Sequence, residues 1–212
     1  VYAQLTNVSL NKGNPEMEIE RISQLISDIY PKLAAKGVNI DELWARIDNA
    51  IVLTILSALK YLERSESVKC PSLGYSRCFQ ILGFDILLDP NLNPTVLEVN
   101  YRPLLDYFRG KERRMKVRMV KEAIQIAAPL SKAQEVVLAK KWSLNDNNWT
   151  TILQTHQEIL QSAYYEREKA LKKSNYVRVF PSQNSELQFK YNEVIQYVRA
   201  QPFEPIPGFE PR

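Results

Sequence analysis

Apolar residues recur at steps of three and four over much of the chain, which predicts a series of amphipathic helices. The pattern covers residues 16–33, 39–63, 120–130, 146–173 and 185–200. In the second segment Asn39 or Asp41 is placed to cap the first turn. Its apolar positions predict a buried stripe made of Ile40, Leu43, Trp44, Ile47, Ile51, Ile55 and Leu59.

A different pattern occupies residues 78–100, where two apolar runs flank a Pro- and Asn-rich segment. Such runs around a turn predict a β-hairpin with strands over 78–89 and 95–100. Residues 1–14 predict a short strand and a polar loop. Helices combined with antiparallel strands indicate an α+β protein.

Each strand of the predicted hairpin carries one acid among aliphatic residues, Asp85 in the first and Glu98 in the second. With the turn centred between residues 91 and 92, Asp89 is expected opposite Pro94 and Asp85 opposite Glu98. Opposed side chains lie about 5 Å apart at Cβ, and like charges there destabilise the pair. Asn100 follows Glu98 by two residues and is therefore expected on the same face.

Two interpretations of this face remain open. Two carboxylates and an amide oxygen select a hard cation such as Mg²⁺, which predicts a metal site made of Asp85, Glu98 and Asn100. Alternatively, the acids are solvated positions on the outward face of an edge hairpin, which strand alternation also permits. The mostly apolar character of the first strand favours the metal site.

Composition narrows the classes of protein to consider. Of the 212 residues, 45% are hydrophobic and 25% are charged, which is typical of a globular protein. No apolar run approaches the roughly 20 residues of a membrane span, and no signal-peptide pattern opens the chain, so we expect neither membrane insertion nor secretion. Cys70 and Cys78 indicate reduced thiols rather than a disulfide framework. A single histidine, His156, argues against a Ser-His-Asp triad or a zinc site with several His ligands.

Residues 109–121 hold seven Lys or Arg against one Glu, a local charge of +6 in a chain whose net charge is +4. This run is either a solvated helix face or a footprint for an acidic partner. No nucleic-acid motif accompanies it, so nucleic acid is not expected. The expected contacts to an acidic partner are Arg109, Lys111, Arg113, Arg114, Arg118 and Lys121.

The hairpin CFQILGFDILLDPNLNPTVLEVNYRP resembles the metal-binding stretch of the tubulin tyrosine ligase-like enzymes, with Asp85, Glu98 and Asn100 in the ligand positions. QLTNVSLNK is similar to a nucleotide-binding segment of that family, and SNYVRVFP to a segment that follows its ligase core. The resemblance covers nearly all of residues 1–182 and is nearest to the polyglutamylating members.

The resemblance implies the C-terminal half of an ATP-grasp ligase core with a β-hairpin metal site, followed by a helical extension. It places residues 1–130 in the core, 131–200 in an extension packed on it, and 201–212 in a Pro-rich tail. Thr6 and Asn7 are implied to contact ATP, and Ser9 and Lys116 the amino-acid substrate, with no nucleophilic side chain. The implied reaction uses ATP and Mg²⁺ to activate a glutamate carboxylate of an acidic tubulin tail as an acyl phosphate.

The chain departs from the family pattern at Gln4, Val8, Thr95 and Arg102, and the family's N-terminal half is absent from it. We therefore expect these residues alone to be inactive. The main prediction is a cytoplasmic tubulin glutamate ligase of the cytoskeleton, cilium, axoneme or basal body, with other axonemal proteins as further partners. The alternative is a catalytically impaired, ligase-like structural protein on axonemal microtubules. In that case Arg102 could neutralise the hairpin acids in place of the metal.

Overall fold

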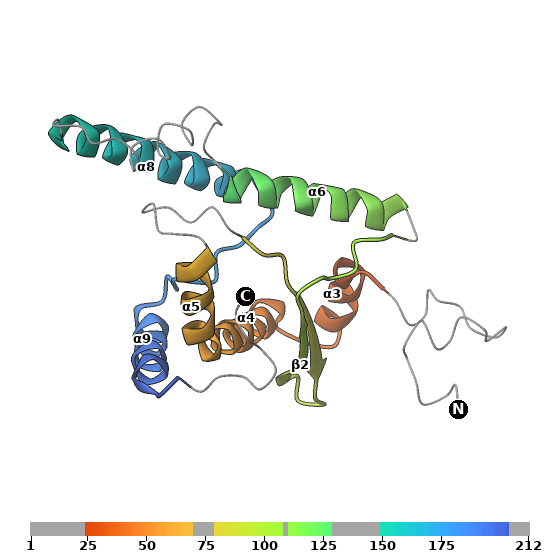
Figure 1. Cartoon of the computed structure of the whole chain (residues 1–212). Coiled ribbons are helices and arrows are strands. Elements are labelled where there is room, and N and C mark those ends of the chain that lie inside the picture. Colours follow the sequence, from red (N-terminus) through yellow and green to blue (C-terminus); the bar gives the residue numbers. More distant parts are fainter. Residues whose placement is uncertain (1–23, 70–78, 108–109, 129–148, 204–212) are drawn as a thin grey trace.

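The computed structural model describes residues 24–69, 79–107, 110–128 and 149–203, excluding the side chains of 65–69 and 149–156. The described part is a set of helices around a small antiparallel sheet, which confirms the predicted mixed fold class (Figure 1). The helices are α3 (Ile26–Ala34), α4 (Ile40–Ser57), α5 (Leu59–Lys69), α6 (Gly110–Ala127), α8 (Trp149–Lys172) and α9 (Ser185–Ala200), and the strands are β1 (Gly83–Leu88) and β2 (Pro94–Asn100).

Helices α6 and α8 run along one side of the molecule, roughly end to end, while the other elements lie on the opposite side (Figure 1). Ala163 of α8 is fully buried, and Ile159 is nearly so. At the junction of the two helices the Arg167 Nε donates to the carbonyl of Ile126 over 3.3 Å. Within the described ranges, no helix combines the length and hydropathy required to span a membrane.

The segment predicted as one helix over 39–63 forms two helices that meet at Ala58. Thr54 and Ser57 donate their hydroxyls to backbone carbonyls of the preceding turn, over 2.8 and 2.7 Å. Such bonds compete with the helical ladder and bend it, which explains a break that the apolar pattern does not reveal. The predicted cap is confirmed, because the Asn39 Oδ1 accepts from the backbone N–H of Glu42 over 3.2 Å.

A hydrophobic core joins α4 to α9. Val52 and Leu56 are buried against Tyr191, a residue that is 2% exposed. The Tyr191 hydroxyl donates to the Asn49 side chain over 3.1 Å, so the buried phenol keeps a polar partner. The most buried residues of α4 therefore differ in part from the predicted stripe. Helix α9 has the predicted bounds, and its first turn is capped by Asn184.

The hairpin contacts α4 through one face. Phe84, Ile86 and Val96 share this half-buried face, whereas Asp85, Leu87 and Thr95 on the other face are exposed in the described part of the chain. An α4 side chain also reaches the turn, where the Arg46 Nη1 lies 3.5 Å from the Asn91 carbonyl oxygen. Gly83 is required by close packing, because a Cβ there would lie 2.9 Å from the Cβ of Pro103.

Candidate functional site

The two hairpin acids lie directly opposite each other. Asp85 pairs with Glu98, and Gly83 pairs with Asn100, so the three predicted ligands share one face of the sheet. Between Asp85 and Ile86 the register shifts by one residue, leaving Leu97 without a partner. A bulge of this kind re-aims the side chains beyond it. Without the extra residue Glu98 would point to the opposite face, so the bulge creates the pair.

The predicted pairing of Asp89 with Pro94 is wrong, because Pro94 lies opposite Leu88. The Asp89 Oδ1 accepts the backbone N–H groups of Asn91 and Asn93, over 2.8 and 2.7 Å. Leu92 has a φ of 62°, which places the last residue of a three-residue loop in the left-handed region. Asp89 thus closes the turn one residue out of the expected register.

Proximity of the acids changes their proton affinity. The hydrogen bond to Glu98, burial and the Glu98 charge together raise the pKa of Asp85. The Asn100 Nδ2 donates to the Glu98 Oε1 over 3.0 Å, which orients that carboxylate. A raised pKa from an opposed carboxylate means that a proton or a cation is favoured between the two.

The acid face is exposed to solvent in the described residues. Asp85 and Glu98 are both exposed, as the solvated interpretation expects. The same side of the hairpin also exposes Leu87 at 57% and the bulged Leu97 at 62%. Single exposed leucines are ordinary on protein surfaces, so the metal assignment rests on the opposed carboxylates and not on these side chains.

Arg102 does not neutralise these acids. Its guanidinium carbon lies 5.3 Å from the centroid of the Tyr101 ring. Among the described residues it forms no ion pair with Asp85 or Glu98. The suggestion that Arg102 replaces a metal at the hairpin is therefore not supported.

Lys116 lies in a half-buried position behind the loop that joins β2 to α6. Its ammonium donates to the carbonyl of Leu104 over 3.1 Å and to that of Asp106, and it pairs with Glu112 over 2.9 Å. These three oxygens use the donors of one ammonium group. Lys116 therefore fixes the loop to the first turns of α6.

Of the other predicted site residues, Thr6, Asn7, Ser9 and Arg109 lie outside the described residues, as do Gln4 and Val8. Among the described residues, no group of three or more His, Cys, Asp or Glu side chains could hold a metal ion. The hairpin set has two such side chains and an amide.

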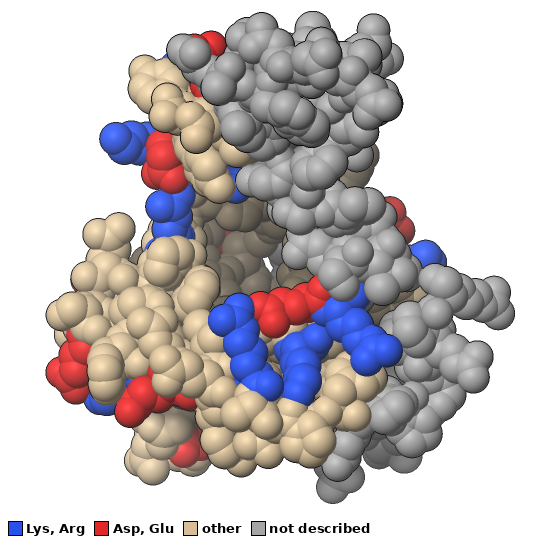
Figure 2. Space-filling model, turned by 60° about the vertical axis from the view of Figure 1, so that its left-hand side comes forward, with Lys and Arg blue, Asp and Glu red and all other residues tan. Residues whose placement is uncertain are grey.

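The predicted basic footprint does not form one uniform face. Lys111 pairs with Asp28 over 3.2 Å, and Arg118 pairs with Glu122 over 2.7 Å. Arg113 lies over the Tyr107 ring at 5.5 Å. On the face that Figure 2 presents, Lys and Arg side chains likewise stand beside Asp and Glu side chains instead of forming an unbroken basic surface.

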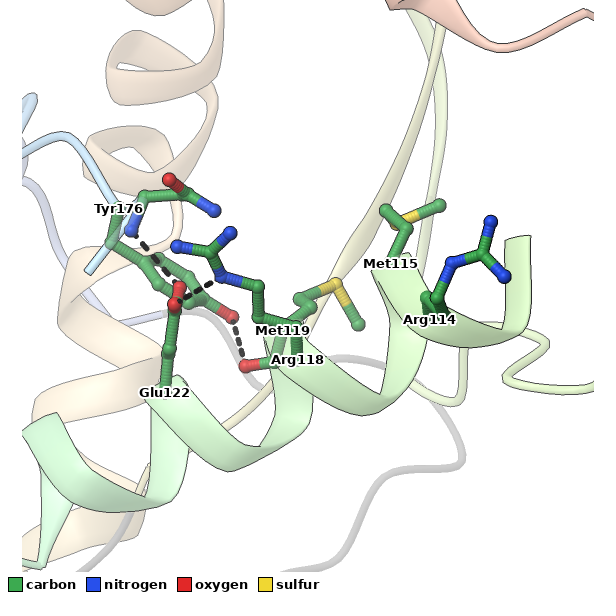
Figure 3. Close-up of a pocket in the computed structure, with 7 residues that line it drawn as sticks. Arg114, Met115, Arg118, Met119, Glu122 and Tyr176 are labelled. Atoms are coloured by element: carbon green, nitrogen blue, oxygen red, sulfur yellow. Dashed lines mark hydrogen bonds and ion pairs between the residues drawn. The ribbon is translucent and has the colours of Figure 1, made fainter. Parts of the chain in front are cut away.

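Two grooves flank α6, and each is lined by two of its basic residues. One, of about 510 Å³, is lined by Lys116 and Lys121 together with the apolar residues Leu105, Tyr107, Val117, Val120 and Ile124. The other, of about 640 Å³, is lined by Arg114 and Arg118 together with Met115, Met119, Glu122, Asn175 and Tyr176. Figure 3 shows this second pocket, in which Arg118 turns toward Glu122 while Arg114 stands one turn earlier on the helix.

Glu122 ties this pocket to the segment after α8. Its Oε1 accepts from the Arg118 Nε, and its Oε2 accepts from the backbone N–H of Asn175 over 2.9 Å. The Tyr176 hydroxyl donates to the Met119 carbonyl over 3.1 Å (Figure 3). The bond from Arg118 and then that from Asn175 hold the pKa of Glu122 below its usual range.

Sequence reasoning did not assign a role to Glu122, Asn175 or Tyr176. The four-residue spacing of Arg118 and Glu122 is a visible signal for a helical ion pair. The contacts to Asn175 and Tyr176 join positions 53 and 57 residues apart, and no local pattern predicts them.

Comparison with known protein families shows that the family model described as "Tubulin-tyrosine ligase family" matches residues 1–136 of the chain. The human protein "Tubulin monoglutamylase TTLL4" is 31% identical over 144 residues, which cover 64% of this chain and 12% of that protein. The Tetrahymena thermophila protein "Probable beta-tubulin polyglutamylase" is 25% identical over 210 residues, which cover 91% of this chain and 18% of that protein. The human protein "Tubulin polyglutamylase TTLL13" is 37% identical over 109 residues, which cover 49% of this chain and 13% of that protein. The chain thus spans less than a fifth of the length of each of these relatives.

Proposed function

We propose, from the premise that the chain belongs to the tubulin-tyrosine ligase family, that the protein is an ATP-dependent tubulin glutamate ligase. In this proposal residues 1–130 form the C-terminal part of an ATP-grasp core, 131–200 form a helical extension, and 201–212 form a Pro-rich tail. The names of the relatives support tubulin as the substrate and glutamate as the amino acid that is added.

The observation that carries the proposal is the opposed pair Asp85 and Glu98, with Asn100 on the same face. Like charges at this spacing destabilise a hairpin unless a cation neutralises them. Carboxylate and amide oxygens are the donors that Mg²⁺ prefers, so the three residues fit that ion. When bound, Mg²⁺ supplies charge neutralisation at the phosphates of ATP.

The remaining site assignments follow the family motifs. Thr6 and Asn7 are proposed to contact ATP, and Ser9 and Lys116 the incoming amino acid. Because the Lys116 ammonium already donates to Leu104 and Asp106, a substrate carboxylate would take the place of Glu112. Lys116 would then both hold the loop and bind the substrate.

The proposed reaction has two steps and needs no nucleophilic side chain. A carboxylate oxygen of a tubulin glutamate attacks the γ-phosphorus of ATP, and ADP leaves. The amine of the second amino acid then attacks the acyl carbon of this acyl phosphate, losing a proton, and inorganic phosphate leaves as the isopeptide bond forms. The protein's part is to orient the reactants and to exclude water.

The acidic tails of tubulin are the proposed partner, and the basic residues of α6 the proposed contact. A tubulin substrate implies a cytoplasmic protein of the cytoskeleton, with a cilium, axoneme or basal body as the proposed location and other axonemal proteins as further partners. The alternative, an impaired structural protein on axonemal microtubules, loses support because Arg102 lies over Tyr101 rather than beside the hairpin acids.

The proposal is tested with the full-length protein, microtubules, ATP and labelled glutamate. We expect label in the tubulin tails and one ADP and one phosphate released for each glutamate added. Release of AMP and pyrophosphate instead would replace the acyl phosphate by an adenylate. Residues 1–212 alone are expected to add no label, and a full-length protein that binds microtubules without adding any amino acid would favour the structural alternative.

A further inference from the structure

The pocket on α6 that holds Arg114 and Arg118 is positively charged in spite of the acid inside it. Arg114 is exposed and has no hydrogen bond or ion pair to another described residue. Glu122 is already bonded to Arg118 and to the Asn175 amide, so its charge is satisfied locally. A guanidinium with no carboxylate partner among the described residues is a ready donor for an anion.

Arg118 is held in one orientation by its own ion pair. The Glu122 Oε1 accepts from the Arg118 Nε over 2.7 Å, and the two terminal amino groups of the guanidinium bond to no other described residue. The side chain of Arg118 is 59% exposed, whereas that of Glu122 is 11% exposed. Glu122 therefore holds Arg118 from the buried side of the ion pair, and the terminal amino groups of Arg118 face outward.

The rest of the lining is apolar. Met115 and Met119 lie one turn apart on the same helix as the arginines, and the Tyr176 ring closes the pocket from the segment after α8 (Figure 3). Such a lining accepts the methylene groups of a side chain that ends in a carboxylate. A phosphate on a polynucleotide backbone has no comparable apolar stem.

We propose that this pocket binds a glutamate side chain of an acidic tubulin tail, with Arg114 as the direct contact and Arg118, oriented by Glu122, as the second. The inference rests on the proposed function for the identity of the partner. It adds a specific recognition pocket where the sequence indicated only a general basic surface. It also makes Glu122 a positioning residue, since it acts through Arg118.

The pair Arg114→Gln and Lys36→Gln separates a pocket from a general charge effect. Both variants remove one positive charge from an exposed side chain, but Lys36 follows α3 and does not line this pocket. We expect Arg114→Gln to weaken binding of a fluorescent oligoglutamate peptide to the full-length protein about tenfold. Lys36→Gln should change it less than about twofold. Equal losses in the two variants would overturn the pocket.

The variant Glu122→Gln tests whether Glu122 positions Arg118, because the loss of positioning and the loss of a negative charge should change peptide affinity in opposite directions. Removing a negative charge beside an anion site should strengthen binding, whereas losing the support of Arg118 should weaken it. We expect weaker binding, about threefold, and no further effect in an Arg118→Gln background. Tighter binding would overturn the positioning role. Should Glu122→Gln fail to fold, Glu122→Asp keeps the charge but is too short for both bonds, and is expected to weaken binding likewise.

Two further measurements identify the ligand. Microtubules stripped of their acidic tails should bind wild type and Arg114→Gln equally, and a remaining difference would overturn the tail as the ligand. An oligonucleotide of equal charge that binds more tightly than oligoglutamate would also overturn it. Glutamate incorporation is measured in parallel. Normal incorporation without the peptide-binding difference rejects the pocket alone, whereas absent incorporation by wild type rejects the proposed function alone.

Discussion

Asp85 on the hairpin and Glu122 on α6 are carboxylates in opposite electrostatic environments. Asp85 faces another acid, and its pKa is raised by Glu98. Glu122 faces a guanidinium and a backbone amide, and its pKa is lowered. The first arrangement destabilises the charged form and the second stabilises it.

The difference separates a carboxylate pair left for a cation from a carboxylate that is satisfied within the fold. Glu122 has its partners within the chain and helps to hold α6 to the segment that follows α8. Among the described residues, the hairpin acids have only the Asn100 amide and each other. Groups whose charge is left uncompensated in the fold are the usual signature of a site completed by a ligand.

The largest expected effect is on catalysis. Glu98→Gln in the full-length protein removes one charge from the proposed Mg²⁺ site and should lower glutamate incorporation at least about 100-fold, since metal charge stabilisation is worth several kcal/mol. Glu122→Gln removes one charge from the carboxylate that is satisfied within the fold. It should lower incorporation only a few-fold at saturating microtubule concentration.

Both rates are measured with labelled glutamate under the same conditions, and circular dichroism confirms that each variant is folded. Unchanged incorporation in Glu98→Gln would reject the metal assignment for that residue. A loss in Glu122→Gln as large as that in Glu98→Gln would mean that the two regions do not differ in the way proposed.

The next effect is on stability, where the two substitutions should have opposite signs. Without divalent cations, Glu98→Gln relieves repulsion across the hairpin and should raise the melting temperature by up to about 2 °C. Glu122→Gln leaves either the Arg118 Nε or the Asn175 amide without its acceptor and should lower it by about 2–4 °C. Thermal unfolding of the two variants beside wild type measures both shifts, and shifts of the same sign would contradict the comparison.

The hairpin could be predicted from the sequence because its determinants are local. Alternation and a turn sequence locate the two strands, and the pairing of Asp85 with Glu98 is observed. That success depended on two compensating features. The turn closes at Asp89 one residue out of the expected register, and the bulge at Leu97 restores the pairing beyond it. The hydrophobic pattern predicts neither the side-chain hydrogen bonds of Asp89 nor the bulge.

The contacts of α6 could be predicted only in part. The charge of residues 109–121 and the four-residue spacing of Arg118 and Glu122 are evident in the sequence, but the pairing of Lys111 with Asp28, 83 residues away, is not. The same holds for the contact of Glu122 with Asn175. Long-range pairs of this kind depend on how the helices pack, which periodicity does not specify.

The smallest expected effect is the pH dependence of stability, and its sign differs between the two carboxylates. Because the folded-state pKa of Asp85 is raised above 3.8, the folded state retains a proton in a window where the unfolded state has lost it. Its contribution to stability therefore falls as the pH rises through that window. For Glu122, whose pKa is lowered from 4.5, the contribution is present above that value and is lost as the pH falls below it.

Melting temperatures of wild type, Asp85→Asn and Glu122→Gln between pH 7 and pH 4, without divalent cations, test both signs. At pH 7 Asp85→Asn should melt about one or two degrees above wild type and Glu122→Gln below it. As the pH falls, the Asp85→Asn difference should shrink because wild type regains its proton, and the Glu122→Gln difference should shrink below about pH 4.5. Added Mg²⁺ should reduce the Asp85→Asn difference at pH 7 and leave the Glu122→Gln difference unchanged, since Glu122 already has a cationic partner whereas the hairpin acids have none among the described residues. If Mg²⁺ changes neither difference, the hairpin pair is an exposed repulsion without a metal, and the contrast between the two regions no longer marks a binding site.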